Sequence, residues 1–155
     1  MPSDLWSFTL DFYARPGVEQ ACLKLQDRGG NICALLCGVW LDQRGIAFDA
    51  KRAGEIRQLA TPWHDRVVGP LRAVRTQWKS AAETDEELSA LRERLKGLEL
   101  DAERELLVRL QRLVQEWPEQ DPQEAGVWLD ALAGEAANEA PDALDILRRV
   151  GKDLA

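Results

Sequence analysis

Hydrophobic residues recur at intervals of three and four along most of the chain, which is the period of an amphipathic α-helix. The first helix is expected to begin after Ser3 as its N-cap and to end before Pro16-Gly17. The second is expected from Val18 to about Arg28, where Gly29-Gly30 breaks it. Their inward positions are the apolar residues at helical spacing: Leu5, Phe8, Phe12, Val18, Cys22 and Leu25.

The segment from Ile32 to Leu41 differs from all others because it consists of apolar residues and one glycine only. A helix of that composition has no face left for water, so other helices normally surround it. We therefore expect this helix at the centre of the core.

The middle of the chain is interrupted by two prolines. Asp49 is expected to cap a short helix that runs through Leu59, and Thr61-Pro62 matches the start of a further helix. Pro70 should kink or split that helix. Beyond it, apolar and basic residues occupy different sides: Leu71, Val74 and Trp78 on one, Arg72, Arg75 and Lys79 on the other.

A longer leucine pattern follows a capping box formed by Thr84 and Glu87. The stripe begins with Leu88, Leu91, Leu95 and Leu98 and shifts its phase near Ala102. An unbroken helix over residues 85–117 would be about 50 Å long, more than a compact chain of this size accommodates without overhang. Gly97 is the expected place for a bend, and the stripe otherwise needs a partner, of which a second copy is the simplest.

Two further helix starts complete the pattern, one at Asp121 to Glu124 and one at Pro141. The sequence thus predicts an all-α protein, a compact bundle of about seven or eight helices with one long helix, straight or bent, in its second half. We expect a single domain over residues 1–155, with a compact bundle in 1–79 and a helical part in 84–155 that packs on it or projects.

Composition agrees with a soluble helical protein: 45% of the residues are hydrophobic, 30% are charged, and the net charge is −7. The apolar runs are too short for a membrane span and the start lacks the basic residues of a signal peptide, so we expect a cytoplasmic protein. Residues 1–80 hold 11 basic and 8 acidic side chains, and residues 81–155 hold 9 and 19. Within the first part, residues 51–79 carry seven bases against two acids.

The N-terminal two thirds resemble a family of known sequence but unknown role. The residues that carry the resemblance are Leu5-Trp6, Phe8, Tyr13, Pro16-Gly17-Val18-Glu19, Cys22-Leu23, Leu25-Gln26-Asp27, Trp40-Leu41, Trp63, Val67-Val68 and Pro70-Leu71-Arg72. They are similar to an uncharacterised proteobacterial family, catalogued as a hypothetical domain of unknown function, over roughly residues 3–110. Asn31 and Cys33 stand where that family tends to have an acidic residue and an asparagine. The resemblance implies no chemistry.

Candidate chemistry is sparse. Cys33 and Cys37 share a helical face, and Cys22 with His64 would complete a four-ligand zinc set, but thiols in so apolar a helix are more often core residues. His64 stands beside Asp65 without a recognisable nucleophile, and the glycines match no phosphate-binding motif. We expect no catalytic residue, no metal and no cofactor.

The preferred interpretation is a non-catalytic helical module that binds another protein or itself. The candidate partner-binding residues are Trp63, Arg66, Arg72, Arg75 and Lys79. One alternative is RNA or ribosome association through the basic residues of 51–79, and another is a helical enzyme or small-ligand binder without a recognisable motif. Neutralisation of the basic face by the acidic second half is the simpler expectation, and an external anionic partner is the competing one.

Overall fold

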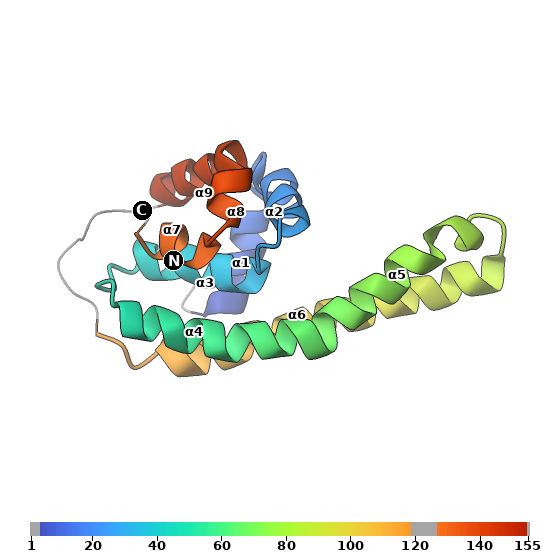
Figure 1. Ribbon diagram of the computed structural model, residues 1–155, viewed down its shortest axis with the longest axis horizontal. Helices are drawn as coiled ribbons and strands as arrows, with labels where there is room; N and C mark the ends of the chain where they lie inside the picture. The colour runs from blue at the N-terminus through green and yellow to red at the C-terminus, as the bar shows by residue number, and fades with distance from the viewer. Residues whose placement is uncertain (1–3, 119–126, 155) are drawn as a thin grey trace.

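The computed structural model describes residues 4–118 and 127–154, and its elements within those ranges are all helices, as predicted. Figure 1 shows a globular part and a pair of helices that projects from it. In chain order the elements are α1 (Leu5–Tyr13), α2 (Val18–Asp27), α3 (Ile32–Gln43), α4 (Ala50–Trp63), η1 (His64–Val68), α5 (Gly69–Ala82), α6 (Glu86–Val114), α7 (Val127–Ala133), α8 (Ala136–Glu139) and α9 (Pro141–Asp153).

Helix α3 lies at the centre of the globular part, as its composition predicts. Every residue from Cys33 to Leu41 is buried. Helix α7 packs directly on Gly38, where an added Cβ would lie 3.1 Å from Cδ1 of Leu132 and 3.3 Å from the backbone of Leu129. A side chain at this position would crowd α7, so the glycine inside α3 favours close packing of the two helices.

The N-cap of α1 is Asp4 rather than Ser3, so that part of the prediction is wrong. The Asp4 carboxylate accepts the Ser7 N–H at 2.8 Å and the Ser7 hydroxyl at 3.0 Å. Asparagine, aspartate and serine are about equally good N-caps, and the sequence pattern does not distinguish neighbouring candidates.

Helices α4, η1 and α5 form one continuous helical segment from Ala50 to Ala82, which corrects two predictions (Figure 1). The first helix does not stop at Leu59, and Thr61-Pro62 does not open a new one. Of the two alternatives expected at Pro70, a kink or a split, the structure excludes the split. Between the prolines the backbone widens into a π-helix, in which the Gly69 N–H bonds the His64 carbonyl. A proline ring crowds the preceding turn, and a wider turn before Pro70 relieves that crowding while the helix continues.

Helix α6 is a single helix of 29 residues and therefore about 43 Å long. Its N-cap is Asp85, which accepts the Leu88 N–H at 3.1 Å, rather than Thr84. The helix runs unbroken through Gly97, the expected bend, and ends at Val114 rather than Trp117. Figure 1 shows the beginning of α6 lying beside α5, far from the globular part. We call residues 69–98, which comprise α5, the turn and the start of α6, the arm.

The C-terminal helices return to the globular part and complete its core. Helix α9 begins at Pro141 as predicted, whereas the helix start expected at residues 121–124 lies outside the described residues. The Asp42 carboxylate at the end of α3 accepts the backbone N–H groups of Trp128 and Leu129, at 3.0 and 3.1 Å. One buried cluster thus joins α1 to α4 with the second half of α6 and α7 to α9.

Candidate protein-interaction surface

One side of the arm and its base carries a network of charged side chains between α5 and α6. Nε of Arg75 donates to Glu99 Oε1 at 2.7 Å, and Nε of Arg72 donates to Glu99 Oε2 at 3.4 Å. Arg72 also reaches Glu103 Oε1 at 3.4 Å, and Nε of Arg92 donates to the Arg75 carbonyl at 2.9 Å. The two helices are therefore joined by a polar contact on this side.

The charged network is partly buried, so its carboxylates depend on the neighbouring arginines. The Glu99 side chain is only 10% exposed, so its carboxylate depends on the two guanidinium groups for its polar partners. Burial raises the pKa of Glu103, and the neighbouring Arg72 lowers it in opposition. For Arg72 and Arg75, the expected neutralisation by the acidic half of the chain is confirmed.

The five residues predicted to bind a partner have different environments. Nε1 of Trp63 donates to the Ala102 carbonyl at 2.9 Å, and the Arg109 guanidinium lies 4.1 Å from the ring centroid. Trp63 therefore ties the base of the arm to α6. Arg66 and Lys79 are exposed, whereas Arg72 and Arg75 belong to the charged network.

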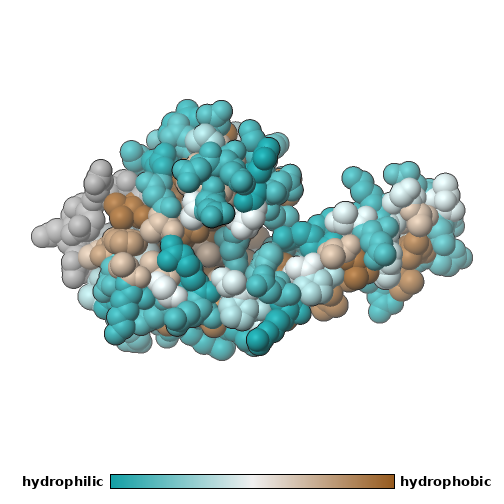
Figure 2. All heavy atoms as spheres, viewed as in Figure 1, coloured by the Kyte–Doolittle hydropathy of each residue, from teal (hydrophilic) through white to brown (hydrophobic). Residues whose placement is uncertain are grey.

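The other side of the arm is apolar, with two exposed leucines and three partly buried side chains. Leu91 is 48% exposed and Leu98 is 53% exposed, and no residue of α5 is buried. Figure 2 shows hydrophobic side chains gathered along the lower edge of the arm in that view. We call the residues of this side the apolar face of the arm: Leu71, Val74, Trp78, Leu91 and Leu98.

Helical geometry explains why the charged and apolar residues separate. Leu71 and Val74 directly precede Arg72 and Arg75, and Leu91 and Leu98 directly precede Arg92 and Glu99. One residue turns a helix by about 100°, so each apolar residue is rotated from the network in the same sense. In an antiparallel pair, the same sense of rotation leads to the same side of both helices. The two helices of the arm together therefore form an amphipathic unit, with one charged and one apolar side.

Helix α5 is also almost uncharged where it meets solvent. Of its exposed residues only Lys79 is charged, and the others are Pro70, Ala73, Thr76, Gln77, Ser80 and Ala81. A helix with one face exposed to solvent normally has charged residues on that face. The outer surface of α5 is therefore poor in charge compared with an ordinary solvent-exposed helix face.

A comparison with protein-family models finds one match, described as Protein of unknown function (DUF2390), over residues 4–110. That range is more than two thirds of the chain and includes the entire arm. The chain belongs to this family. No curated protein and no solved structure matches it. Membership in DUF2390 confirms the resemblance to an uncharacterised family and leaves the function to be inferred from the structure.

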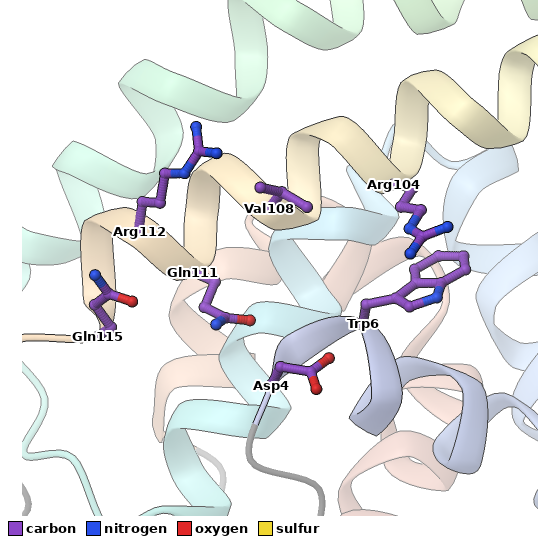
Figure 3. Close-up of a pocket in the computed structure, with 7 residues that line it drawn as sticks. All are labelled: Asp4, Trp6, Arg104, Val108, Gln111, Arg112 and Gln115. Carbon is purple, nitrogen blue, oxygen red and sulfur yellow. The ribbon is translucent and has the colours of Figure 1, made fainter.

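Outside the arm, this DUF2390 protein has a shallow groove of about 420 Å³ between α1 and α6. Figure 3 shows its lining side chains: Asp4, Trp6, Arg104, Val108, Gln111, Arg112 and Gln115. Several of their polar groups already have partners, because Gln111 Oε1 accepts the Leu5 N–H at 2.8 Å and Arg104 lies 4.9 Å from the Trp6 ring centroid. The side chains that line the groove thus connect the start of α1 to α6.

The thiols have the environment of core residues. Cys22, Cys33 and Cys37 are free and buried, and burial raises the pKa of Cys22 and of Cys37 to about 12. At neutral pH such thiols are protonated, and the thiolate is the reactive form. In residues 4–118 and 127–154, no three His, Cys, Asp or Glu side chains are grouped as a metal ion requires. None of the helices in those ranges has the length and apolarity needed to span a membrane.

Sequence reasoning missed two parts of the site in this DUF2390 chain. Glu99 and Glu103 were not predicted as part of the site, because acids on a long helix, here accompanied by Asp101 and Glu105, are normally solvated. The apolar face was noticed only as two separate stripes, on residues 71–78 and 88–98. The signal that links them is the position of each apolar residue next to a charged one, but it has meaning only once the helices are known to be antiparallel.

Proposed function

We propose that the protein is a non-catalytic, cytoplasmic helical module that binds another protein, and that the arm is its binding element. The observation that carries this proposal is the exposure of Leu91 and Leu98, close to one half each, on a structure that projects from the globular part. Leucines elsewhere are equally exposed, at Leu10, Leu23 and Leu100, but Leu91 and Leu98 lie seven residues apart on one helix and share a side of the arm with other apolar residues. Apolar side chains that are grouped in this way mark interaction sites.

The energetics of the arm support the same conclusion. Beyond the globular part, α5 and the start of α6 have only each other to pack on, and α5 has no fully buried residue. Helices in proteins gain most of their stability from packing of an apolar face. Two helices that pack only on each other bury little apolar surface. A partner on the apolar face supplies the missing burial, at roughly 25 cal/mol for each Å² of apolar surface removed from water.

Anionic partners receive less support. RNA binding depends on unpaired basic side chains that neutralise phosphates, and Arg72 and Arg75 already have carboxylate partners. The enzymatic alternative also lacks a distinguishing feature, since the raised thiol pKa values of Cys22 and Cys37 favour the unreactive form. Protein binding through the apolar face remains the interpretation with the most direct support.

Affinity purification from the native host tests the proposal with three forms of the full chain. The double variant Leu91→Glu/Leu98→Glu places charges on the apolar face, and Leu23→Glu places one on α2, where Leu23 is 49% exposed. The parent and Leu23→Glu should retain the same specific partners, and the double variant should lose them. Retention of all partners by the double variant would contradict the proposal, provided that circular dichroism shows equal helix content.

A further inference from the structure

We propose that the apolar face of the arm binds the same face of a second copy, so that two arms form a four-helix bundle at the centre of a homodimer. This inference rests on the proposed function and names the partner. It assigns to each copy a surface made of Leu71, Val74, Trp78, Leu91 and Leu98, of which Leu91 and Leu98 are about half exposed and the other three are partly buried.

The architecture of the arm favours a bundle. Two antiparallel helices with one apolar side form a layer, and a second such layer is what completes a hydrophobic core. A two-fold axis between the layers makes the contact self-complementary, so no second kind of surface is needed.

The spacing of the apolar residues is that of a coiled-coil bundle. Leu71 and Trp78 are seven residues apart on α5, and so are Leu91 and Leu98 on α6. The flanking pair Leu88 and Leu95, both half-buried, repeats the same interval. A seven-residue repeat keeps one seam facing a neighbouring helix over several turns. The repeat therefore fits a long contact between helices rather than a single docked side chain.

Charge directs the copies toward each other through the arm. Residues 69–98 contain six basic and five acidic side chains and so have a net charge of +1. Because the whole chain has a net charge of −7, the residues outside the arm have a net charge of −8. Two globular parts with that charge repel each other, whereas two nearly neutral arms do not. Contact through the arms also lets the globular parts stay apart, because the arm projects from them (Figure 1).

The size of the contact predicts how tight the dimer is. Helix α5 has 14 residues and is therefore about 21 Å long, and two adjacent helices are about 20 Å wide. The flat footprint is about 400 Å² on each copy, below the roughly 800 Å² per partner of a standard stable interface. We therefore expect a reversible dimer that dissociates on dilution.

Sedimentation equilibrium of the full chain from low micromolar to several hundred micromolar concentration tests the proposal. The parent and Leu23→Glu should shift from monomer to dimer over this range, and Leu91→Glu/Leu98→Glu should stay monomeric with unchanged helix content. Added salt should strengthen the dimer because it screens repulsion between the acidic globular parts. A monomeric parent throughout, or a dimer that persists in the double variant, would overturn the inference.

A second measurement separates failure of the dimer from failure of the proposed function. Two copies with different affinity tags are mixed, and recovery of the second tag with the first is compared between the parent and the double variant. Equal recovery in both would overturn the dimer through the arm. If no second copy is recovered but the parent still captures a different host protein that the double variant loses, the dimer is wrong while the proposed function stands.

Discussion

Nε of Arg75 lies 2.7 Å from Oε1 of Glu99, and this ion pair joins the two helices of the arm at a point where the carboxylate is nearly buried. Because Leu98 and Val74 directly precede these two residues, the ion pair also fixes which side of the arm is left apolar. The ion pair between the helices and the apolar character of the other side are consequences of one helix register.

Removal of one partner of that ion pair should weaken the arm. Arg75→Leu leaves Glu99, whose side chain is 10% exposed, with less compensation and should lower the unfolding free energy by about 1–3 kcal/mol. The matched control is Lys96→Leu, which breaks an exposed pair with Glu93 and should change stability by less than about 1 kcal/mol. Equal effects of the two substitutions in urea denaturation would show that the Arg75–Glu99 contact is not special.

A charge in the middle of α3 should abolish the fold. Leu36 is 3% exposed within the all-apolar segment, so Leu36→Asp buries a carboxylate without a partner and should remove the cooperative thermal transition. Leu23→Asp, at a position 49% exposed, should leave the transition in place. A cooperative melting curve of Leu36→Asp close to that of the parent would show that α3 is not the centre of the core.

The pH dependence of stability should include a contribution from Asp42. Burial raises the pKa of Asp42 to about 6, in spite of the two backbone N–H groups that it accepts. An acid whose pKa is higher in the folded state than in the unfolded state binds its proton more tightly when folded, so its contribution to stability falls as pH rises from about 4 to 6. Asp42→Asn lacks this titration and should gain stability relative to the parent over that interval. Parallel pH profiles for the two proteins would contradict the assignment.

The two glycines of the arm should differ in how much stability they gain from alanine. A Cβ at Gly97 meets nothing within 4 Å, so Gly97→Ala should stabilise α6 by roughly 0.5–1 kcal/mol. At Gly69, a Cβ would lie 3.0 Å from the His64 carbonyl oxygen, so the strain there should cancel most of this gain. Differential scanning calorimetry of both variants measures the contrast. A larger gain at Gly69 would mean that the π turn is not held rigidly.

The central helix α3 was predictable because its amino-acid composition alone indicates that it is buried. No arrangement of neighbours leaves the segment from Ile32 to Leu41 at a surface without a large exposed apolar area. The start of α9 at Pro141 was equally predictable. Proline suits the first position of a helix because its missing N–H would have no partner there and its φ angle is already helical.

Continuity through Pro62 and Pro70 was not predictable for the opposite reason. Thr61-Pro62 is a good local start signal, and only packing along α6 makes one continuous helix preferable. The pairing of α5 with α6 likewise follows from contacts between residues far apart in sequence, such as Arg72 with Glu103. The sign of the charge on the basic face therefore suggested an internal acidic partner, but not which carboxylates supply it.

Amide hydrogen exchange tests the central claim, that the arm is the binding surface, without any substitution. Exchange is compared between dilute protein and protein that is concentrated or saturated with its captured partner. If the arm is the binding surface, exchange slows only within residues 69–82 and 86–98, while α3 and α9 are unchanged. Slower exchange in the globular part with an unaltered arm would contradict it.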